Sequence, residues 1–424
     1  MKILVIGSGG REHAICEQFK KSPKVKDIFA ITGNAGIAQI ATCINNIDIK
    51  NHAEIANFCK KNTIDLVFIG SEQPLVDGLV DDLKKVNINV FGPSKYAAQL
   101  EGSKDFMKKI ATENNVPTAK YQTFLSEKNC LNFANTLGFP CVIKADGLAA
   151  GKGVVIAQNE KEFLSTIKEF FAGKFGEASK KIIVEEFLTG LEVSYFVLCD
   201  GKNFIPLGFA HDHKKVGEGE TGLNTGGMGS FSPSPFIDKK LENEIINTII
   251  KPTLDALKKS GNPFFGALFA GIILTKNGPK LLEYNVRFGD PETQVILPRI
   301  KSDFFDLIMA ATLGKLDSTT VEFDEENKFV CIVMAAKGYP ENYQKGSEIK
   351  GLQEAGAISG IKILHAGTKL KNNKITTNGG RVLNIIAQAK SFKEARKKAY
   401  VAIDLIDWKD GFARSDIAKK AEDL

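Results

Sequence analysis

Short runs rich in β-branched and aromatic residues alternate with helical patterns along the first hundred residues. The runs are KILVIG, DIFAIT, IDLVFIG and INVFG, and helices are expected between them from about Arg11, His52 and Pro74. This alternation is typical of βαβ units, which build a parallel sheet covered by helices. The sequence therefore predicts a Rossmann-like N-terminal domain of the α/β class.

The rest of the chain follows a different pattern. At 424 residues it is too long for one hydrophobic core, and about one domain per 150 residues suggests about three. Further strands are expected at PCVIKADG, GVVIA, KIIVEEFL, LEVSYFVLCDG, FAGIILT and PKLLEYNV, with a glycine-rich loop at 217–229 and a long helix at about 239–260. We expect a first domain at 1–101, an α+β region at 102–327, and a small C-terminal α/β domain at 328–424.

Composition narrows the class of protein. Charged residues make up 25% and apolar residues 43%, as in ordinary globular proteins. The net charge of +6 comes from 56 basic and 50 acidic residues, which is weak support for a nucleic-acid partner. No apolar run approaches the ~18 residues of a membrane span, and the first residues read as a strand rather than a signal peptide. Seven cysteines without a CxxC pair predict reduced thiols in a cytoplasmic protein.

The stretch GSGGRE follows the first expected strand, where a dinucleotide fold places G-x-G-x-x-G. Gly7 and Gly9 fit this fingerprint, but Glu12 stands at the third glycine position, so binding of NAD or FAD is disfavoured. Gly9 and Gly10 still place backbone N–H groups at a helix start, which suits an anion such as a sugar phosphate. A tight turn without a ligand is the alternative.

A second glycine-rich stretch, IKADGLAAGKGVV, resembles a P-loop only superficially. Three residues separate Gly147 from Gly151, and Gly153 follows Lys152 where a hydroxyl should stand. Lys144, at the end of an apolar strand, needs an anionic partner because burial of a lone charge is costly. The loop could close over phosphates, or it could be a surface turn with a solvated lysine.

The stretch LLEYNVRFGDPET carries a more specific pattern. Glu283, Asn285 and Arg287 are spaced two apart at the end of a strand, so their side chains share one face. Oxygen ligands suit magnesium, and a neighbouring guanidinium suits a phosphoryl group. The alternative is a solvent-facing polar side of the strand.

A third cluster, His211, Asp212 and His213, could suggest a transition-metal site. On a strand the two histidines face one way and the aspartate the other, and no further histidine lies nearby in the sequence. We therefore do not expect zinc here.

These motifs together resemble the ATP-grasp superfamily, in which a nucleotide lies between two α+β lobes. The resemblance rests on Lys104, Lys144, GLAAGKGV, VEEFL and EYNVRFGDPET. Within the superfamily, GSGGREHA, HDHKKVGEGETGLNTGGMGSFSPSP, NVRFGDPETQ and TNGGRVL occur in an order similar to that of the phosphoribosylamine–glycine ligase family. The resemblance implies a two-lobed ATP-grasp region with a lid at about 120–192.

The resemblance also implies an activity. ATP, glycine and 5-phosphoribosylamine would give glycinamide ribonucleotide, ADP and phosphate through a glycyl phosphate, as a step of purine biosynthesis, with Mg²⁺ or Mn²⁺ as cofactor. The expected partners are these small molecules, neither nucleic acid nor membrane, and a transient contact with the enzyme that produces phosphoribosylamine is plausible because this amine is unstable.

Residue roles follow from the matched motifs. Catalytic roles are expected for Arg287 and Lys144, and metal binding for Glu283 and Asn285. ATP binding is expected for Lys104, Lys144, Gly151, Lys152, Gly153, Glu185, Glu186, Leu188 and Glu192. Binding of the other substrates is expected for Gly9, Asp212, Lys214, Gly226, Gly227, Arg287 and Asp290.

The chain departs from the superfamily pattern in one respect. The strand FAGIILT supplies no carboxylate for a further metal ion, which puts binding of two metal ions in doubt. Three alternatives stay open at this stage: another ATP-grasp carboxylate–amine ligase, a nucleotide-binding protein without catalysis, and a dehydrogenase.

Overall fold

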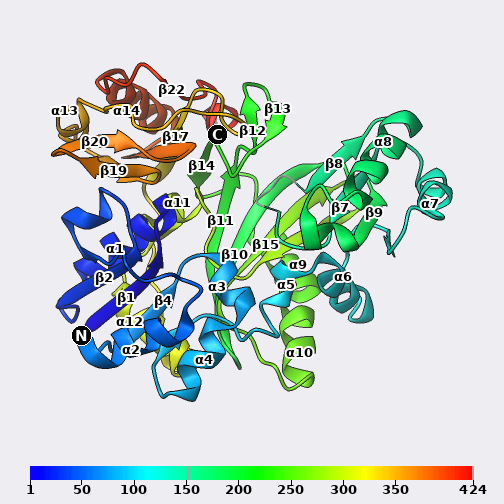
Figure 1. The fold of residues 1–424 in the computed structure, drawn as a ribbon, viewed down its shortest axis with the longest axis horizontal. Coiled ribbons are helices and arrows are strands. Elements are labelled where there is room, and N and C mark those ends of the chain that lie inside the picture. The colour runs from blue at the N-terminus through cyan, green and yellow to red at the C-terminus, as the bar shows by residue number, and fades with distance from the viewer. Residues whose placement is uncertain (150–152, 423–424) are drawn as a thin grey trace.

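A computed structural model describes residues 1–149 and 153–422, and its N-terminal part is a parallel sheet with helices on its faces (Figure 1). The strand order is β3-β2-β1-β4-β5, and all registers are parallel. The predicted Rossmann-like fold is confirmed. The strands are β1 (Lys2–Gly7), β2 (Asp27–Thr32), β3 (Thr42–Cys43), β4 (Leu66–Ile69) and β5 (Val90–Phe91). The helices are α1 (Gly10–Lys21), η1 (Ile37–Gln39), α2 (His52–Asn62), α3 (Glu72–Asp77) and α4 (Leu79–Lys85).

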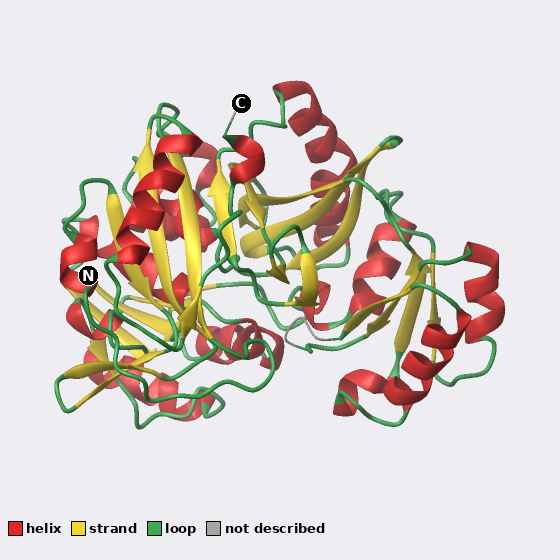
Figure 2. Cartoon of the chain, turned by 90° about the horizontal axis from the view of Figure 1, so that it is seen from above, coloured by secondary structure: helices red, strands yellow, loops and turns green. Residues whose placement is uncertain are grey.

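A four-stranded antiparallel sheet stands at one end of the molecule (Figure 2). It follows two helices, α5 (Gln99–Gly102) and α6 (Lys104–Glu113), and its order is β6-β9-β7-β8. Its buried apolar residues all come from 124–184, so this unit has a core of its own. The strands are β6 (Tyr121–Phe124), β7 (Cys141–Ala145), β8 (Val154–Ala157) and β9 (Ile182–Glu186), and the helices are α7 (Cys130–Leu137), α8 (Glu160–Phe171) and η2 (Gly176–Lys180).

A nine-stranded sheet forms the centre of the molecule and continues into the C-terminal region. Its main path is β16-β15-β10-β11-β14-β17-β21-β18, with β22 paired to β17, and its pairings are antiparallel. The strands are β10 (Leu191–Asp200), β11 (Phe204–Asp212), β14 (Gly229–Ser232), β15 (Phe265–Thr275), β16 (Gly278–Asn285), β17 (Lys328–Ala336), β18 (Ile361–His365), β21 (Arg381–Ala389) and β22 (Gly411–Phe412).

Two hairpins and a set of helices complete the chain. The hairpins are β12 (Lys215–Gly217) with β13 (Thr221–Asn224), and β19 (Thr368–Lys371) with β20 (Lys374–Thr377). The helices are α9 (Lys239–Ile245), η3 (Ile246–Ile250), α10 (Lys251–Lys259), α11 (Thr293–Ile296), η4 (Leu297–Arg299), α12 (Phe304–Thr312), η5 (Leu316–Ser318), α13 (Leu352–Gly356), α14 (Phe392–Asp404) and η6 (Lys419–Ala421). No helix within the described ranges is both long and apolar enough to cross a membrane.

Two expectations about the middle of the chain need correction. The stretch 217–229 is not a plain loop, because it contains most of the β12–β13 hairpin and meets β14 at Gly229. The helix expected at 239–260 is one helical segment in which a π-helical stretch, η3, separates α9 from α10. Such a stretch widens the helix locally without ending it, so apolar periodicity alone does not reveal it.

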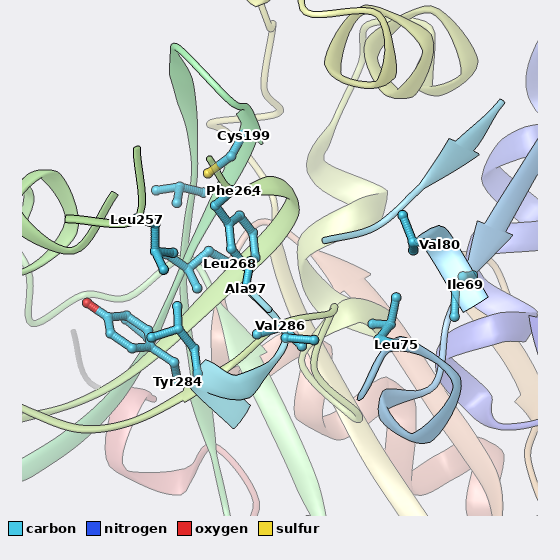
Figure 3. Packing of buried hydrophobic residues seen from close by; sticks show 14 of the residues in the cluster. Ile69, Leu75, Val80, Ala97, Cys199, Leu257, Phe264, Leu268, Tyr284 and Val286 are labelled. Carbon is cyan, nitrogen blue, oxygen red and sulfur yellow. The ribbon is translucent and has the colours of Figure 1, made fainter. Parts of the chain in front are cut away.

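One apolar core joins the N-terminal sheet to the central sheet. Figure 3 shows Leu75 and Val80 on the side of the first domain and Val286 toward Tyr284 of the central sheet. All four side chains are at most 2% exposed, and burial of one such side chain stabilises by roughly 1.5–3 kcal/mol. This packing fixes the end of β16 against the helices that follow β4.

Candidate active site

The end of β16 presents polar groups on one side. Glu283, Asn285 and Arg287 are partly exposed, whereas Tyr284 and Val286 between them are buried. The alternation inferred from the sequence is therefore present. It places a carboxylate, an amide and a guanidinium along one line.

Glu283 and Asn285 keep their oxygens available. Neither side chain makes a hydrogen bond or an ion pair with another described residue. Across the ladder they face Gly271 and Phe269 of β15, which carry no ligand group. One carboxylate oxygen and one amide oxygen suit Mg²⁺, which completes its octahedron with water and substrate oxygens. Within 1–149 and 153–422, no group of three or more histidine, cysteine or carboxylate side chains could hold a metal ion.

Arg287 is held by two carboxylates that sequence reasoning did not find. Its Nη2 donates to Glu101 Oε1 at 2.8 Å, and its Nε lies 3.4 Å from Glu72 Oε2. The other Glu101 oxygen accepts the Val286 N–H at 2.8 Å. Burial opposes ionisation of Glu72, but Arg287 and Arg11 lower its pKa to about 2. The guanidinium is thereby fixed beside the Glu283–Asn285 pair.

Lys104 begins helix α6 and points back to the loop that follows β7. Its Nζ donates to the carbonyls of Ala145 and Gly147 at 2.9 and 3.1 Å. Burial lowers the pKa of Lys104, while the Glu283 carboxylate opposes this shift. Lys104 at the start of α6 and Glu283 in β16 are therefore close enough to influence each other electrostatically.

Lys144 lies in β7 and forms an ion pair with Glu185 of β9. Glu185 also pairs with Lys108 of α6, and its side chain is only 3% exposed. Glu185 was expected to contact ATP, but its carboxylate is enclosed between Lys108 and Lys144. No pattern in the sequence signalled Lys108.

The glycine loop after β7 is described only in part. The Gly153 carbonyl accepts the Ala145 N–H at 2.8 Å and closes the base of the loop. Gly151 and Lys152, both expected to bind ATP, lie outside the described residues.

The stretch between β9 and β10 was expected to meet the base and ribose of ATP. The Glu186 N–H donates to the Lys120 carbonyl at 2.9 Å, and its carboxylate pairs with Lys280 at 3.1 Å. Leu188 is partly exposed between the two strands. The Glu186 N–H is therefore already occupied, so a base could use only other groups of this stretch.

Glu192 and Lys214 pair with each other at 2.9 Å, although they were expected to bind different substrates. Burial opposes the charge of Lys214, but Glu192, Glu283 and Asp212 raise its pKa above the ordinary value. Lys214 therefore lies among three carboxylates that come from β10, β16 and β11.

Two further carboxylates, Asp212 and Glu292, lie close together near Lys214. Burial, and the charge of Glu292, raise the pKa of Asp212 well above its ordinary range, and burial also raises that of Glu292. Glu292 Oε1 accepts from Ser194 at 3.0 Å, while Asp212 Oδ1 has no partner among the described residues. An ammonium or amine group of a substrate could complete this pair.

Arg381, at the start of β21, brings the C-terminal region into the site. Its Nη1 donates to the Gly226 carbonyl at 2.6 Å and the Asp290 carbonyl at 2.7 Å, and its Nη2 lies 3.3 Å from the Asp290 carboxylate. Gly227 has φ +112°, and a Cβ there would lie 2.3 Å from Pro291 Cδ. The stretch TNGGRVL contained this arginine, but nothing in its spacing indicated a partner.

Asp290 is engaged by the protein itself, although it was expected to hold the glycine ammonium. Besides Arg381, it accepts a hydrogen bond from Gln294 Nε2 at 2.7 Å. A Cβ on Gly9 would lie 3.2 Å from its Oδ2, so the first glycine loop reaches the same place. Residues from three regions of the chain therefore converge here.

The first glycine loop differs from the expectation of free N–H groups. The Gly9 N–H donates to Glu12 Oε2 at 2.6 Å, so the first N–H at this helix start is already satisfied. A Cβ at Gly7 or Gly70 would lie 2.6 or 2.3 Å from the Glu12 side chain. Glu12 thus fills the space that a third glycine would leave in a dinucleotide fold.

His211 and His213 form no metal site. Both rings pack against Phe231, with centroids 4.8 and 6.0 Å away. Their nitrogens bond to Ser234 and to backbone groups, and burial lowers the pKa of each to about 3. These are neutral, structural histidines.

The two sheets and the lysine and carboxylate groups between them define the ATP-grasp class. The biotin carboxylase domain of 2-oxoglutarate carboxylase from Hydrogenobacter thermophilus, solved with MgADP, shares this fold with a TM-score of 0.74 at 17% identity. The match covers 97% of this chain and 91% of that one.

The comparisons also define the family. The phosphoribosylglycinamide synthetase models match residues 1–101 (N domain), 102–293 (ATP-grasp domain) and 329–420 (C domain). Phosphoribosylamine–glycine ligase of Brucella melitensis is 47% identical over 421 residues, 99% of this chain and 98% of that protein. The crystal structure of phosphoribosylamine–glycine ligase from Thermotoga maritima matches with a TM-score of 0.84 at 31% identity, over 99% of this chain and 100% of that one. This chain belongs to the phosphoribosylamine–glycine ligase family.

Proposed function

We propose that this chain joins glycine to 5-phosphoribosylamine at the expense of ATP, giving glycinamide ribonucleotide, ADP and phosphate in purine biosynthesis. Family membership over the full length supports this reaction. The observation that carries it is the position of Lys104 at the start of α6, where it lies near both Glu283 of β16 and Lys144 of the four-stranded sheet.

The first chemical step is phosphoryl transfer. An oxygen of the glycine carboxylate attacks the γ-phosphorus of ATP, the bond to the ADP oxygen breaks, and glycyl phosphate forms. Lys104 and Lys144 would hold the phosphates of ATP in line, and Arg287 would offset the negative charge that develops as the acyl phosphate forms.

A divalent cation fits the donor oxygens of Glu283 and Asn285. Mg²⁺, or Mn²⁺, when bound there, supplies neutralisation of the phosphate charge. The Glu283 carboxylate would also favour the charged forms of Lys104 and Lys214, because its negative charge acts to raise the pKa of both lysines.

The second step is acyl transfer. The amine of phosphoribosylamine attacks the acyl carbon, the carbon–oxygen bond to phosphate breaks, and the proton that the nitrogen loses as the amide forms passes to the departing phosphate. Asp212, Glu292 and Lys214 are proposed to bind the amine-bearing substrates, with Gly9, Gly226, Gly227 and Asp290 shaping the pocket around them. Arg381 is added to this group because it ties Gly226 to Asp290.

The ATP side is proposed to include the 146–153 loop with Gly151, Lys152 and Gly153, and the stretch from Glu185 to Glu192 with Glu186 and Leu188. Lys120 to Glu192 would act as the lid. The separate core of residues 124–184 supports this, because a unit with its own core can move as a body.

Three broader assignments accompany the activity. We propose the domain limits 1–101, 102–327 and 328–424. A cytoplasmic location is proposed because the seven cysteines are free thiols, six of them buried. A transient contact with the enzyme that makes phosphoribosylamine stays a prediction based on the instability of that amine.

The test is ADP release by the purified protein with MgATP, glycine and freshly generated phosphoribosylamine, each omitted in turn. Release that requires both co-substrates supports the proposal. Release with a different amino acid or amine would move the chain to another ATP-grasp ligase, and no release would favour a nucleotide-binding protein without catalysis.

A further inference from the structure

Lys108 is a buried charge that the mechanism above does not use. It lies within α6, its side chain is 1% exposed, and its ammonium contacts Oε2 of Glu185. Lys144 contacts Oε1 of the same carboxylate. One buried anion is therefore shared by two cations, of which one is proposed to bind the phosphates of ATP.

The two lysines are held very differently. Lys108 Nζ also donates to Thr118 Oγ1 at 2.9 Å and lies 5.4 Å from the centre of the Tyr121 ring. Lys144 is 11% exposed, and Glu185 is its single side-chain partner in the part of the chain that the structure describes. Lys108 is thus fixed, whereas one contact holds Lys144.

Thr118 connects Lys108 to β16, the strand that carries Glu283 and Asn285. Thr118 Oγ1 donates to the Leu281 carbonyl at 2.7 Å, two residues before Glu283. The Lys108 ammonium is therefore held by Glu185 of β9 and, through Thr118, is linked to β16, and neither contact involves Lys144.

Charge compensation decides what Lys144 can do. If Lys144 turned to a phosphate and left Glu185 alone, a buried carboxylate would lose its counter-ion, which is strongly unfavourable. Burial opposes ionisation of Glu185, yet the two ammonium groups lower its pKa, in keeping with a carboxylate that stays charged. Because Lys108 remains beside Glu185, the departure of Lys144 does not leave the buried carboxylate without a counter-ion.

We propose that Lys108 is a positioning residue that keeps the Glu185 carboxylate compensated, so that Lys144 can leave it for the phosphates of ATP. The inference rests on the proposed function, in which Lys144 binds those phosphates. It assigns a role in nucleotide binding to a residue that does not touch the nucleotide.

The test is the equilibrium dissociation constant of MgATP, measured by calorimetry on the full chain without glycine. Lys108→Met should weaken binding about tenfold, because Glu185 then holds Lys144 alone. The matched control is Lys109→Met on the same helix, where the side chain is 70% exposed and no change is expected. Thermal unfolding of each variant, recorded separately, reports stability.

A double-mutant cycle separates positioning from a purely structural role. In the background of Lys144→Met, adding Lys108→Met should cause little further loss of affinity for MgATP. The reason is that Lys144, the lysine that Glu185 would otherwise retain, is already absent. A full tenfold loss in that background would overturn the inference. If Lys108→Met alone does not fold, Lys108→Arg decides, since it keeps a cation beside Glu185 and should bind MgATP within a few-fold of the parent. Tenfold weaker binding by Lys108→Arg with an unchanged unfolding temperature would also overturn it.

Failure of the inference and failure of the proposed function give different results. A parent protein that does not bind MgATP, or Lys144→Met that binds as well as the parent, would refute the proposed role of Lys144. Normal binding by Lys108→Met, together with weak binding by Lys144→Met, would refute only the role of Lys108.

Discussion

Replacement of Arg381 by methionine tests whether the C-terminal region is part of the active site. Methionine keeps an apolar stem of similar length but removes every donor. The change breaks two short hydrogen bonds, to the carbonyls of Gly226 and Asp290, and the ion pair with the Asp290 carboxylate. The Gly226–Gly227 turn and the Asp290 segment would then lose the group that connects them.

The magnitude follows from these contacts. Hydrogen bonds that involve a charged group contribute about 1.5–3 kcal/mol each. The Arg381 side chain is 21% exposed, so water can replace part of what is lost, and we take about 3 kcal/mol for the whole set. If the turn must be held for the amine substrate to react, kcat/KM for phosphoribosylamine should fall about 100-fold.

The assay compares kcat/KM for phosphoribosylamine with the dissociation constant of MgATP. We expect kcat/KM for phosphoribosylamine to fall and the dissociation constant of MgATP to stay within a few-fold. The reason is that Arg381 contacts Gly226 and Asp290 and neither Lys104 nor Lys144. Arg396→Met is the matched control, because that arginine also donates to backbone carbonyls, those of Ser415 and Ile417. It should lower the unfolding temperature but not kcat/KM. Unchanged kcat/KM in Arg381→Met would refute the argument.

Three further predictions follow from the contacts of the site. Arg287→Met should keep MgATP binding and lower turnover about 100-fold or more, measured as ADP release, and it should also destabilise the fold by roughly 3–5 kcal/mol, because Glu101 loses its buried partner. Gly227→Ala should lower the free energy of unfolding in urea by roughly 1–3 kcal/mol, since φ is +112° and a Cβ would meet Pro291; an unchanged midpoint would contradict this. Burial lowers the pKa of His13 to about 3 and of His365 to about 4. The native state needs both rings neutral, so stability is present above about pH 6.5 and is lost as the pH falls below it, by about 1.4 kcal/mol per histidine at pH 5.5. In His13→Gln, the part of this loss that comes from His13 should be absent. The free energy of unfolding in urea, measured at pH 7.5 and 5.5, would show this as a smaller difference between the two pH values.

Local patterns carried most of the fold. The β-rich runs of the first hundred residues lie in β1, β2, β4 and β5, because a parallel strand buried on both faces must be apolar along its length. Glycine density at 217–229 was misleading, since β12 and β13 pair through their backbones and need no apolar side chains. The strands β11 and β14 were also missed, because their residues gain their burial from neighbours distant in the sequence.

The polar residues at the end of β16 were the part of the site most open to sequence reasoning. Spacing by two along a strand puts Glu283, Asn285 and Arg287 on one face in any fold. The same reasoning could not find Glu72 and Glu101, which reach Arg287 from helices far earlier in the chain. It also assigned separate duties to Glu192 and Lys214, which the fold pairs.

The sequence by itself determined the class of each lobe, the family motifs and the line of polar groups on β16, because these depend on residue type and on spacing within one element. Only the tertiary structure decided which charges meet. Lys108 and Lys144 share Glu185, Arg381 joins Gly226 to Asp290, and Glu12 fills the first glycine turn. Each of these contacts depends on how sheets and helices pack, and buried charges are stable only where that packing supplies a partner.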